Sequence, residues 1–160
     1  MSLFDIFRKQ PGAAGASAKP AGAGLLAALV GRYALVKGKP PGEASLMGEW
    51  WEGRHEGRRL AFMERGKGLV LFLGEPAEVT EIYLVREASG AFGLAASTDS
   101  PELAAVQASL PRLSASVLEL QVYENLRGLA LQLDERATPE SVEADLAIAH
   151  SALEAIERAG

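Results

Sequence analysis

The sequence predicts an α+β domain, in which an antiparallel β-sheet of about six to seven strands is packed by an N-terminal helix and a long C-terminal helix. Three observations support this fold class. Short apolar segments recur through the middle of the chain, and the clearest pair alternates apolar with polar residues. The last twenty residues repeat apolar positions at helical spacing. A short helix is expected to be inserted before the last hairpin.

The chain divides into three parts. Its 160 residues and 48% hydrophobic content suit one ordinary domain with a tail. Residues 1–10 form a short amphipathic segment. Residues 11–24 contain only Pro, Gly, Ala, Ser and one Lys, which predicts a flexible linker because no large side chain is present to bury. Residues 25–160 are predicted to form a single globular α+β domain.

The helices are predicted from spacing and from their terminal residues. Apolar residues at helical spacing indicate a helix over residues 23–36, although Gly31 leaves its second half open to an extended conformation. Ser100 and Pro101 open a short helix over residues 101–109. Thr138 and Pro139 open the long C-terminal helix, whose apolar face should cover the sheet.

The strands are predicted from short apolar or alternating segments between turn residues. The expected ranges are 46–52, 58–64, 69–73, 79–86, 92–95, 117–123 and 129–133. The last two form the clearest hairpin, because Leu118, Leu120 and Val122 alternate with polar residues in the first of them.

The N-terminal segment has the composition of a docking segment. Leu3, Phe4, Ile6 and Phe7 are large and apolar, and two basic residues follow them at positions 8 and 9. A helix this short is marginal in water by itself, so the segment needs a surface on which to lie. Three alternatives are open, namely a protein partner, a membrane surface, and the protein's own folded domain.

The stretch EWWEGRHEGRRLAF, residues 49–62, contains both tryptophans and predicts a β-hairpin. His55–Glu56–Gly57 fits a three-residue turn with glycine at the left-handed position. A protein-contact site is expected from residue types enriched at interfaces, here Trp50, Trp51, Arg54, Arg58 and Arg59. The alternative is an ordinary hairpin in which arginine lies over tryptophan. Nucleic-acid binding is not expected, because glutamates partly cancel the arginines.

The sequence contains no motif for catalysis. The absence of cysteine excludes disulfides and thiolate chemistry. His55–Glu56 resembles the start of an HExxH zinc motif, but Arg59 stands where the second histidine belongs. His150, on the C-terminal helix, is interpreted as a half-buried structural residue. No phosphate-binding glycine loop or nucleophile elbow is present. We therefore expect no catalytic residues, no metal site, no cofactor and no enzymatic activity.

The charge distribution bears on possible contact surfaces, and the first residues bear on the location of the protein. Residues 1–67 carry eleven Lys and Arg against six Asp and Glu, whereas residues 68–160 carry five against fifteen. Two ordinary solvated faces explain this asymmetry better than a basic contact surface, because no uninterrupted basic run exists. The first ten residues lack the features of a signal peptide, so we expect a cytoplasmic protein.

The order of the elements resembles that of the small α+β type III secretion chaperones and related bacterial proteins. The resemblance covers element order only, and it implies a domain that binds partner proteins and often forms a homodimer. The leading functional hypothesis is therefore a non-enzymatic protein-binding, adaptor or chaperone-like module with a tethered docking segment. The alternatives are a peripheral membrane protein that associates weakly through residues 2–9, and a small-ligand-binding domain.

Overall fold

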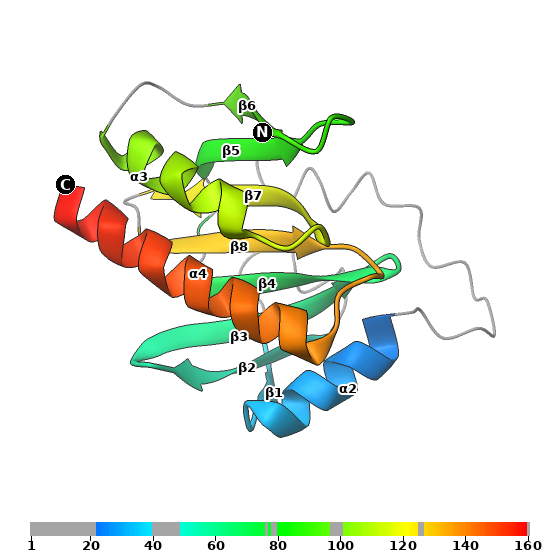
Figure 1. The fold of residues 1–160 in the computed structure, drawn as a ribbon. Coiled ribbons are helices and arrows are strands. Elements are labelled where there is room, and N and C mark those ends of the chain that lie inside the picture. The colour runs from blue at the N-terminus through cyan, green and yellow to red at the C-terminus, as the bar shows by residue number, and fades with distance from the viewer. Residues whose placement is uncertain are drawn as a thin grey trace.

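A computed structural model describes residues 22–39, 49–75, 77, 80–96, 101–124 and 127–159. These residues form one antiparallel sheet of eight strands with three α-helices. Figure 1 shows how the helices lie against the sheet. The predicted α+β class is confirmed, and the strand count is slightly higher than predicted. The helices are α2 (Gly22–Arg32), α3 (Pro101–Ser109) and α4 (Pro139–Ala159). The strands are β1 (Val36–Gly38), β2 (Trp50–His55), β3 (Arg58–Arg65), β4 (Gly68–Gly74), β5 (Thr80–Arg86), β6 (Phe92–Ala96), β7 (Val117–Tyr123) and β8 (Gly128–Leu133).

The strand order in the sheet is β1-β2-β3-β4-β8-β7-β5-β6, and every neighbouring pair is antiparallel. The β7–β8 hairpin therefore lies between β4 and β5, which are consecutive along the chain. This hairpin is the one that the alternating leucines predicted. Helix α3 connects β6 to β7 and packs against α4 (Figure 1).

One face of the sheet is covered by the three helices, and the main core lies beneath them. We call it the helix face. Side chains from every helix join side chains from β3, β4, β5, β7 and β8 in one buried cluster. Leu29 of α2, Val106 of α3 and Leu153 of α4 are each completely buried in it. The apolar spacing of the last twenty residues correctly predicted that α4 faces the sheet.

The other face of the sheet, which we call the opposite face, carries a second apolar cluster. Its members alternate along the strands with the residues of the main core. They are Trp50, Ala61, Met63, Val70, Phe72, Tyr123 and Ala130. Polar side chains adjoin this cluster, and Arg65 is paired there with Gln132 and Glu119. The sheet is therefore apolar on both faces here, whereas the alternation of apolar and polar residues over 117–123 indicated one polar face.

Helix α2 is shorter than the predicted helix over residues 23–36. Ala34 has a left-handed φ of 51°, and the N–H of Leu35 donates to the carbonyl of Val30 at 3.0 Å. This bond closes the helix in the pattern known as a Schellman motif. The residues that follow form β1 at the edge of the sheet. The extended alternative for the second half of this segment is therefore correct from residue 36.

Three other predicted segments lie partly or wholly outside the described residues. Helix α2 begins at Gly22, inside the predicted linker, and residues 11–21 of that linker lie outside the described ranges. The predicted docking segment, residues 1–10, also lies outside them. The predicted strand over residues 46–52 corresponds to β2, which begins at Trp50.

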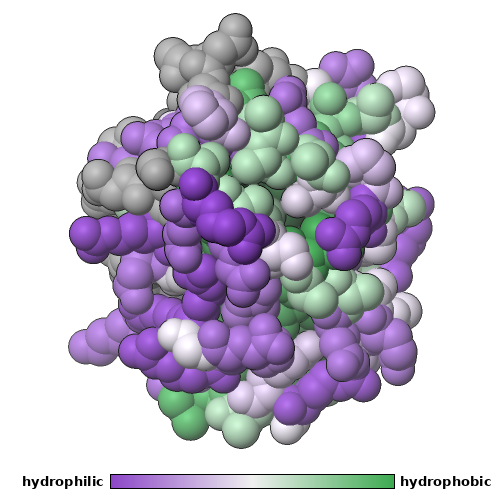
Figure 2. Space-filling model, turned by 60° about the vertical axis from the view of Figure 1, so that its left-hand side comes forward, coloured by the Kyte–Doolittle hydropathy of each residue, from purple (hydrophilic) through white to green (hydrophobic). Residues whose placement is uncertain are grey.

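Figure 2 brings forward the side of the molecule that lies at the left of Figure 1. Hydrophilic residues dominate this view, and a narrower band of hydrophobic residues runs down between them. Among the described helices, none combines the length and the apolar character that a bilayer-spanning helix requires.

Candidate functional site

The β2–β3 hairpin places His55 at the end of β2, where it pairs with Arg58 across the turn. Glu56 and Gly57 alone form the turn, and both have positive φ angles, 51° and 81°. The predicted three-residue turn is therefore wrong. A two-residue turn of this kind needs left-handed backbone at both positions, and glycine was expected at only one of them. Because side chains alternate along a strand, His55 lies on the helix face, as Trp51 does.

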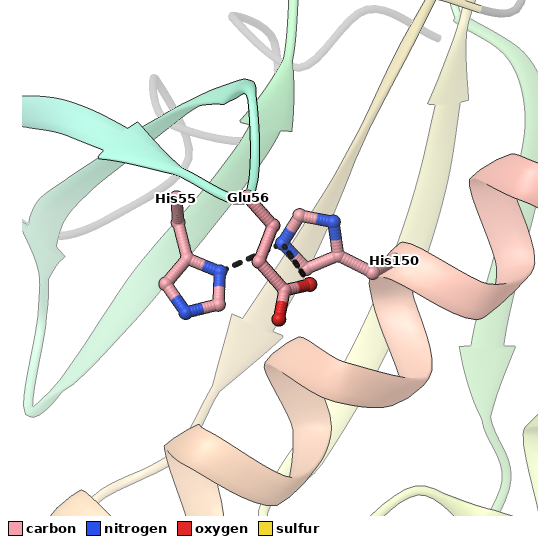
Figure 3. Close-up of side chains that lie close together, drawn as sticks. All are labelled: His55, Glu56 and His150. Carbon is pink, nitrogen blue, oxygen red and sulfur yellow. Dashed lines mark hydrogen bonds and ion pairs between the residues drawn. The ribbon is translucent and has the colours of Figure 1, made fainter.

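Helix α4 places His150 against the hairpin. The Nδ1 atom of His55 lies 2.8 Å from the Nε2 atom of His150, although the residues are 95 positions apart in the sequence (Figure 3). The ring centroids are 5.0 Å apart and the rings are tilted by 39°. His150 is 5% exposed, and His55 is half-buried. The two histidines of the chain are thus in direct contact.

Glu56 adds a carboxylate to this pair. Its Oε2 atom lies 3.8 Å from Nε2 of His150, and one ligand atom from each of the three residues lies within 4.8 Å of the others. Figure 3 shows the Glu56 side chain extending from the turn toward the His150 ring. Glu56 is exposed, so its carboxylate meets solvent on one side. We call His55, Glu56 and His150 the histidine site.

The electrostatic environment keeps His150 neutral. Burial lowers the pKa of His150 below its ordinary value of 6.5, and the neighbouring His55 and Arg58 act in the same direction. The Glu56 and Glu154 carboxylates oppose this shift. At neutral pH the His150 ring therefore carries no charge. At 2.8 Å, one ring nitrogen donates its proton to the lone pair of the other.

Two contacts fix the position of the histidine site between hairpin and helix. Tyr33, just after α2, meets the His55 ring edge-on at a centroid distance of 5.4 Å. Arg58, the partner of His55 across the turn, forms a 2.6 Å ion pair with Glu157 of α4. The second contact offsets the charge of Arg58 beside the site. The Tyr33 contact restricts the His55 ring, and the ion pair holds the hairpin against α4.

The five predicted protein-contact residues do not form one surface, because they divide between the two faces of the sheet. Trp50, Arg54 and Arg59 lie on the opposite face, whereas Trp51 and Arg58 lie on the helix face. Trp50 is only 1% exposed and packs on Phe72 at a centroid distance of 4.7 Å.

The arginines of this group are engaged within the chain. Arg59 forms an ion pair with Glu52, and its guanidinium lies 6.0 Å from the Trp50 ring. Arg54 is exposed and donates to the carbonyl of Gly57 at 3.3 Å. These contacts match the alternative of an ordinary hairpin in which arginine lies over tryptophan.

Trp51 lies beside a groove between α2 and the edge of the sheet, which we call the α2 groove. Its volume is about 330 Å³. It is lined by Leu26, Ala27, Val30, Glu49, Trp51 and Glu64. The Trp51 indole N–H donates to Glu49, and Lys37 forms a 3.2 Å ion pair with the same carboxylate. The Lys37 hydrogen bond and the Trp51 hydrogen bond lower the pKa of Glu49.

Glu64 is the other acidic group of the α2 groove. Burial raises the pKa of Glu64 above its ordinary value, and the Glu49 carboxylate raises it further. Among the described residues, the Glu64 carboxylate has neither a hydrogen bond nor an ion pair. The groove therefore combines an apolar wall with an acidic group that has no counterion in the described part of the chain.

Sequence reasoning did not bring His55 and His150 together. His150 was interpreted as a half-buried structural residue, and His55 was assigned to a hairpin turn. No spacing motif links positions 55 and 150. The sequence offered only a local signal for the site. Glu56, which favours right-handed backbone, stands at the first central position of the turn, where a glycine or asparagine is usual. Neither a family model, nor a curated protein, nor a solved structure matches this chain. The candidate function therefore depends on the geometry of the histidine site.

Proposed function

We propose that the protein binds a divalent transition-metal ion at the histidine site, through His55 Nδ1, His150 Nε2 and the Glu56 carboxylate. One observation carries this proposal. The chain has two histidines, and their ring nitrogens lie 2.8 Å apart beside a carboxylate, although they are 95 residues apart in the sequence. Convergence of imidazole and carboxylate groups from distant elements is typical of metal centres.

The distances are close to those of a metal centre. Two nitrogen ligands, each about 2.1 Å from a zinc ion, lie roughly 3 to 3.4 Å apart. The observed 2.8 Å separation therefore needs to widen by only a few tenths of an ångström. The exposed Glu56 side chain can complete the set by rotating toward the rings, without a change in the backbone.

The donor set favours particular ions. Imidazole nitrogen binds zinc, copper, nickel, cobalt and iron, whereas calcium and magnesium prefer oxygen ligands. The lowered pKa of His150 favours binding, because a neutral ring releases no net proton when it binds a metal. The ring that donates the His55–His150 hydrogen bond must first move its proton to its other nitrogen, so that both facing nitrogens present lone pairs. With three protein ligands, the remaining coordination positions would be filled by water on the solvent side of Glu56.

A bound ion would fasten the β2–β3 hairpin to α4. In its absence these elements are joined near the site by the His55–His150 hydrogen bond and the Arg58–Glu157 ion pair. Metal–ligand bonds are stronger than either contact, and they form only when both elements are in their native positions. Metal binding should therefore stabilise the folded chain, and above the dissociation constant this stabilisation should grow with the logarithm of the free ion concentration.

The test is calorimetric titration of the full chain, after removal of metal by a chelator, with Zn²⁺, Ni²⁺ and Co²⁺. The expected stoichiometry is one ion per chain. His55→Gln and His150→Gln should each weaken binding at least about tenfold, or ~1.4 kcal/mol. Glu140→Gln removes an exposed carboxylate at the N-terminal end of α4 and should leave binding unchanged. Equal affinities for all four proteins would contradict the proposal, since the ion would then bind elsewhere.

Protein binding, the function predicted from the sequence, is the second candidate, and the α2 groove is the observation that favours it. Apolar side chains, a half-buried tryptophan and an acidic group with no counterion among the described residues are features of a contact site for a basic partner segment. The test is a pull-down from cell lysate in which the proteins retained by the full chain are compared with those retained by its variants; we call this experiment comparative capture. Trp51→Ala and Glu64→Lys should lose a partner that Arg54→Ala retains, and loss by none of the variants would contradict it.

A further inference from the structure

The α2 groove is the strongest feature outside the histidine site. Leu26, Ala27 and Val30 form one wall on α2, and Trp51 on β2 contributes an aromatic surface. Two of these side chains, Val30 and Trp51, are only half-buried. An apolar groove of this size next to an aromatic ring is suited to a few large apolar side chains rather than to a broad protein interface.

The charges of the groove select a basic occupant. Glu49 is already engaged by Lys37 and by the Trp51 indole. Glu64, in contrast, has no partner within the described part of the chain. A Lys or Arg side chain that reached Glu64 would supply the missing counterion in a partly buried place, where an ion pair is less screened than at the surface.

The N-terminal segment of the same chain has the matching chemistry. Leu3, Phe4 and Phe7 are large and apolar, and Arg8 and Lys9 follow them directly. We infer that residues 2–9 of this chain dock in the α2 groove, with the phenylalanines against Trp51 and the apolar wall of α2, and with Arg8 or Lys9 at Glu64. The inference names an occupant for the groove of the second proposed function and rests on that groove.

The connection between segment and groove is short enough for this contact. Residues 10–21 join the segment to α2, and a flexible chain of that length has an end-to-end distance of roughly 20 Å. Leu26 lies about 6 Å along α2 from Gly22, so the groove is near the point of attachment. A tethered segment is present at millimolar effective concentration, which favours its binding over that of an equally weak free ligand.

Docking of residues 2–9 in the groove would compete with the two other roles predicted for this segment, namely binding to a membrane and binding to a protein partner. A segment whose phenylalanines occupy the groove does not present them to a membrane or to a protein partner. A partner that uses the same groove must displace residues 2–9. The segment would then act as a built-in competitor at this site.

The test uses the absence of cysteine in the full chain. Ser2→Cys provides a unique position for a nitroxide spin label, which broadens the NMR signals of nearby protons. The Trp51 indole N–H signal should lose most of its intensity when the label is attached and recover it on reduction of the label. The Trp50 indole is buried on the opposite face of the sheet, and its chemical shift serves as the measure of folding.

Variants decide whether the broadening reports docking. Phe4→Ser/Phe7→Ser and Glu64→Lys should each restore the Trp51 signal in the labelled chain. Glu81→Lys makes the same charge change at an exposed position on β5 and should leave the broadening intact. Broadening that persists in the first two variants would overturn the inference, since proximity through the tether alone would explain it.

Two further outcomes would also overturn the inference. One is equal intensity of the Trp51 signal with active and reduced label. The other is broadening that arises between chains, detected by mixing a labelled chain without ¹⁵N with an unlabelled ¹⁵N chain. Either outcome leaves the second proposed function intact, because an external partner could still use the groove. Failure of the comparative capture, in turn, says nothing against docking of residues 2–9.

Discussion

At the scale of single residues, His150 should make stability depend on pH. Its pKa in the folded chain is lowered, mainly by burial, so the unfolded chain takes up a proton on this ring first as the pH falls. The free energy of unfolding should therefore decrease between about pH 7.5 and pH 5.5 in the metal-free protein. Urea denaturation of wild type and His150→Gln at both pH values measures this, and the variant should show a weaker dependence. An unchanged pH dependence in His150→Gln would contradict the assignment of this effect to His150.

Glu56 should lower the stability of the metal-free chain while it contributes to metal binding. Its left-handed φ of 51° is unfavourable for a residue other than glycine, asparagine or aspartate. Glu56→Asn creates the Asn-Gly sequence that two-residue turns prefer, and it should recover about 0.5–1 kcal/mol of the cost of that conformation.

The metal titration supplies the other half of this prediction. Glu56→Asn should weaken Zn²⁺ binding while it raises the melting temperature of the metal-free chain. Gly57→Ala is the matched control in the same turn. Alanine is unfavourable at the φ of 81° that Gly57 adopts, so this variant should have a lower melting temperature. An Asn variant with unchanged zinc affinity would exclude Glu56 as a ligand.

At the scale of elements, the end of α2 shows why one boundary was missed. Glycine usually occupies the left-handed position that ends a helix in a Schellman motif, and here Ala34 occupies it. The sequence therefore contains no stop signal before Gly38. Ala34→Gly should stabilise the protein by about 0.5–1 kcal/mol. Ala28→Gly, at an exposed position inside α2, should instead destabilise it, and melting curves of both variants test the difference.

The contact between α4 and the segment that precedes β7 depends on one buried carboxylate. Asp145 is 0% exposed and accepts hydrogen bonds from the backbone N–H and the hydroxyl of Ser114, at 2.8 and 2.6 Å. Asp145→Ala leaves both donors without this partner and should cost about 2–4 kcal/mol. Denaturant unfolding measures the loss, with Glu154→Ala on the exposed side of α4 as control. Equal losses in the two variants would contradict this role.

At the scale of the whole molecule, most of the fold followed from local patterns. The alternating leucines predicted the β7–β8 hairpin, and the Thr138–Pro139 start was correct for α4. In the structure, Thr138 Oγ1 accepts the N–H of Ser141 at 3.1 Å. The strand order was beyond prediction, since the insertion of β7–β8 between β4 and β5 depends on contacts between distant segments. The burial of Trp50 on the opposite face was missed for the same reason.

The histidine site could not have been predicted at all from periodicity. His55 and His150 meet because the β2–β3 hairpin and α4 pack together, and neither position carries a signal for the other. The most direct measurement is NMR of the ¹⁵N-labelled imidazole rings during addition of Zn²⁺ to the metal-free full chain. We expect the signals of His55 Nδ1 and His150 Nε2 both to shift to metal-bound values, with saturation at one ion per chain. Ring nitrogens that keep their hydrogen-bonded shifts in excess Zn²⁺ would contradict it.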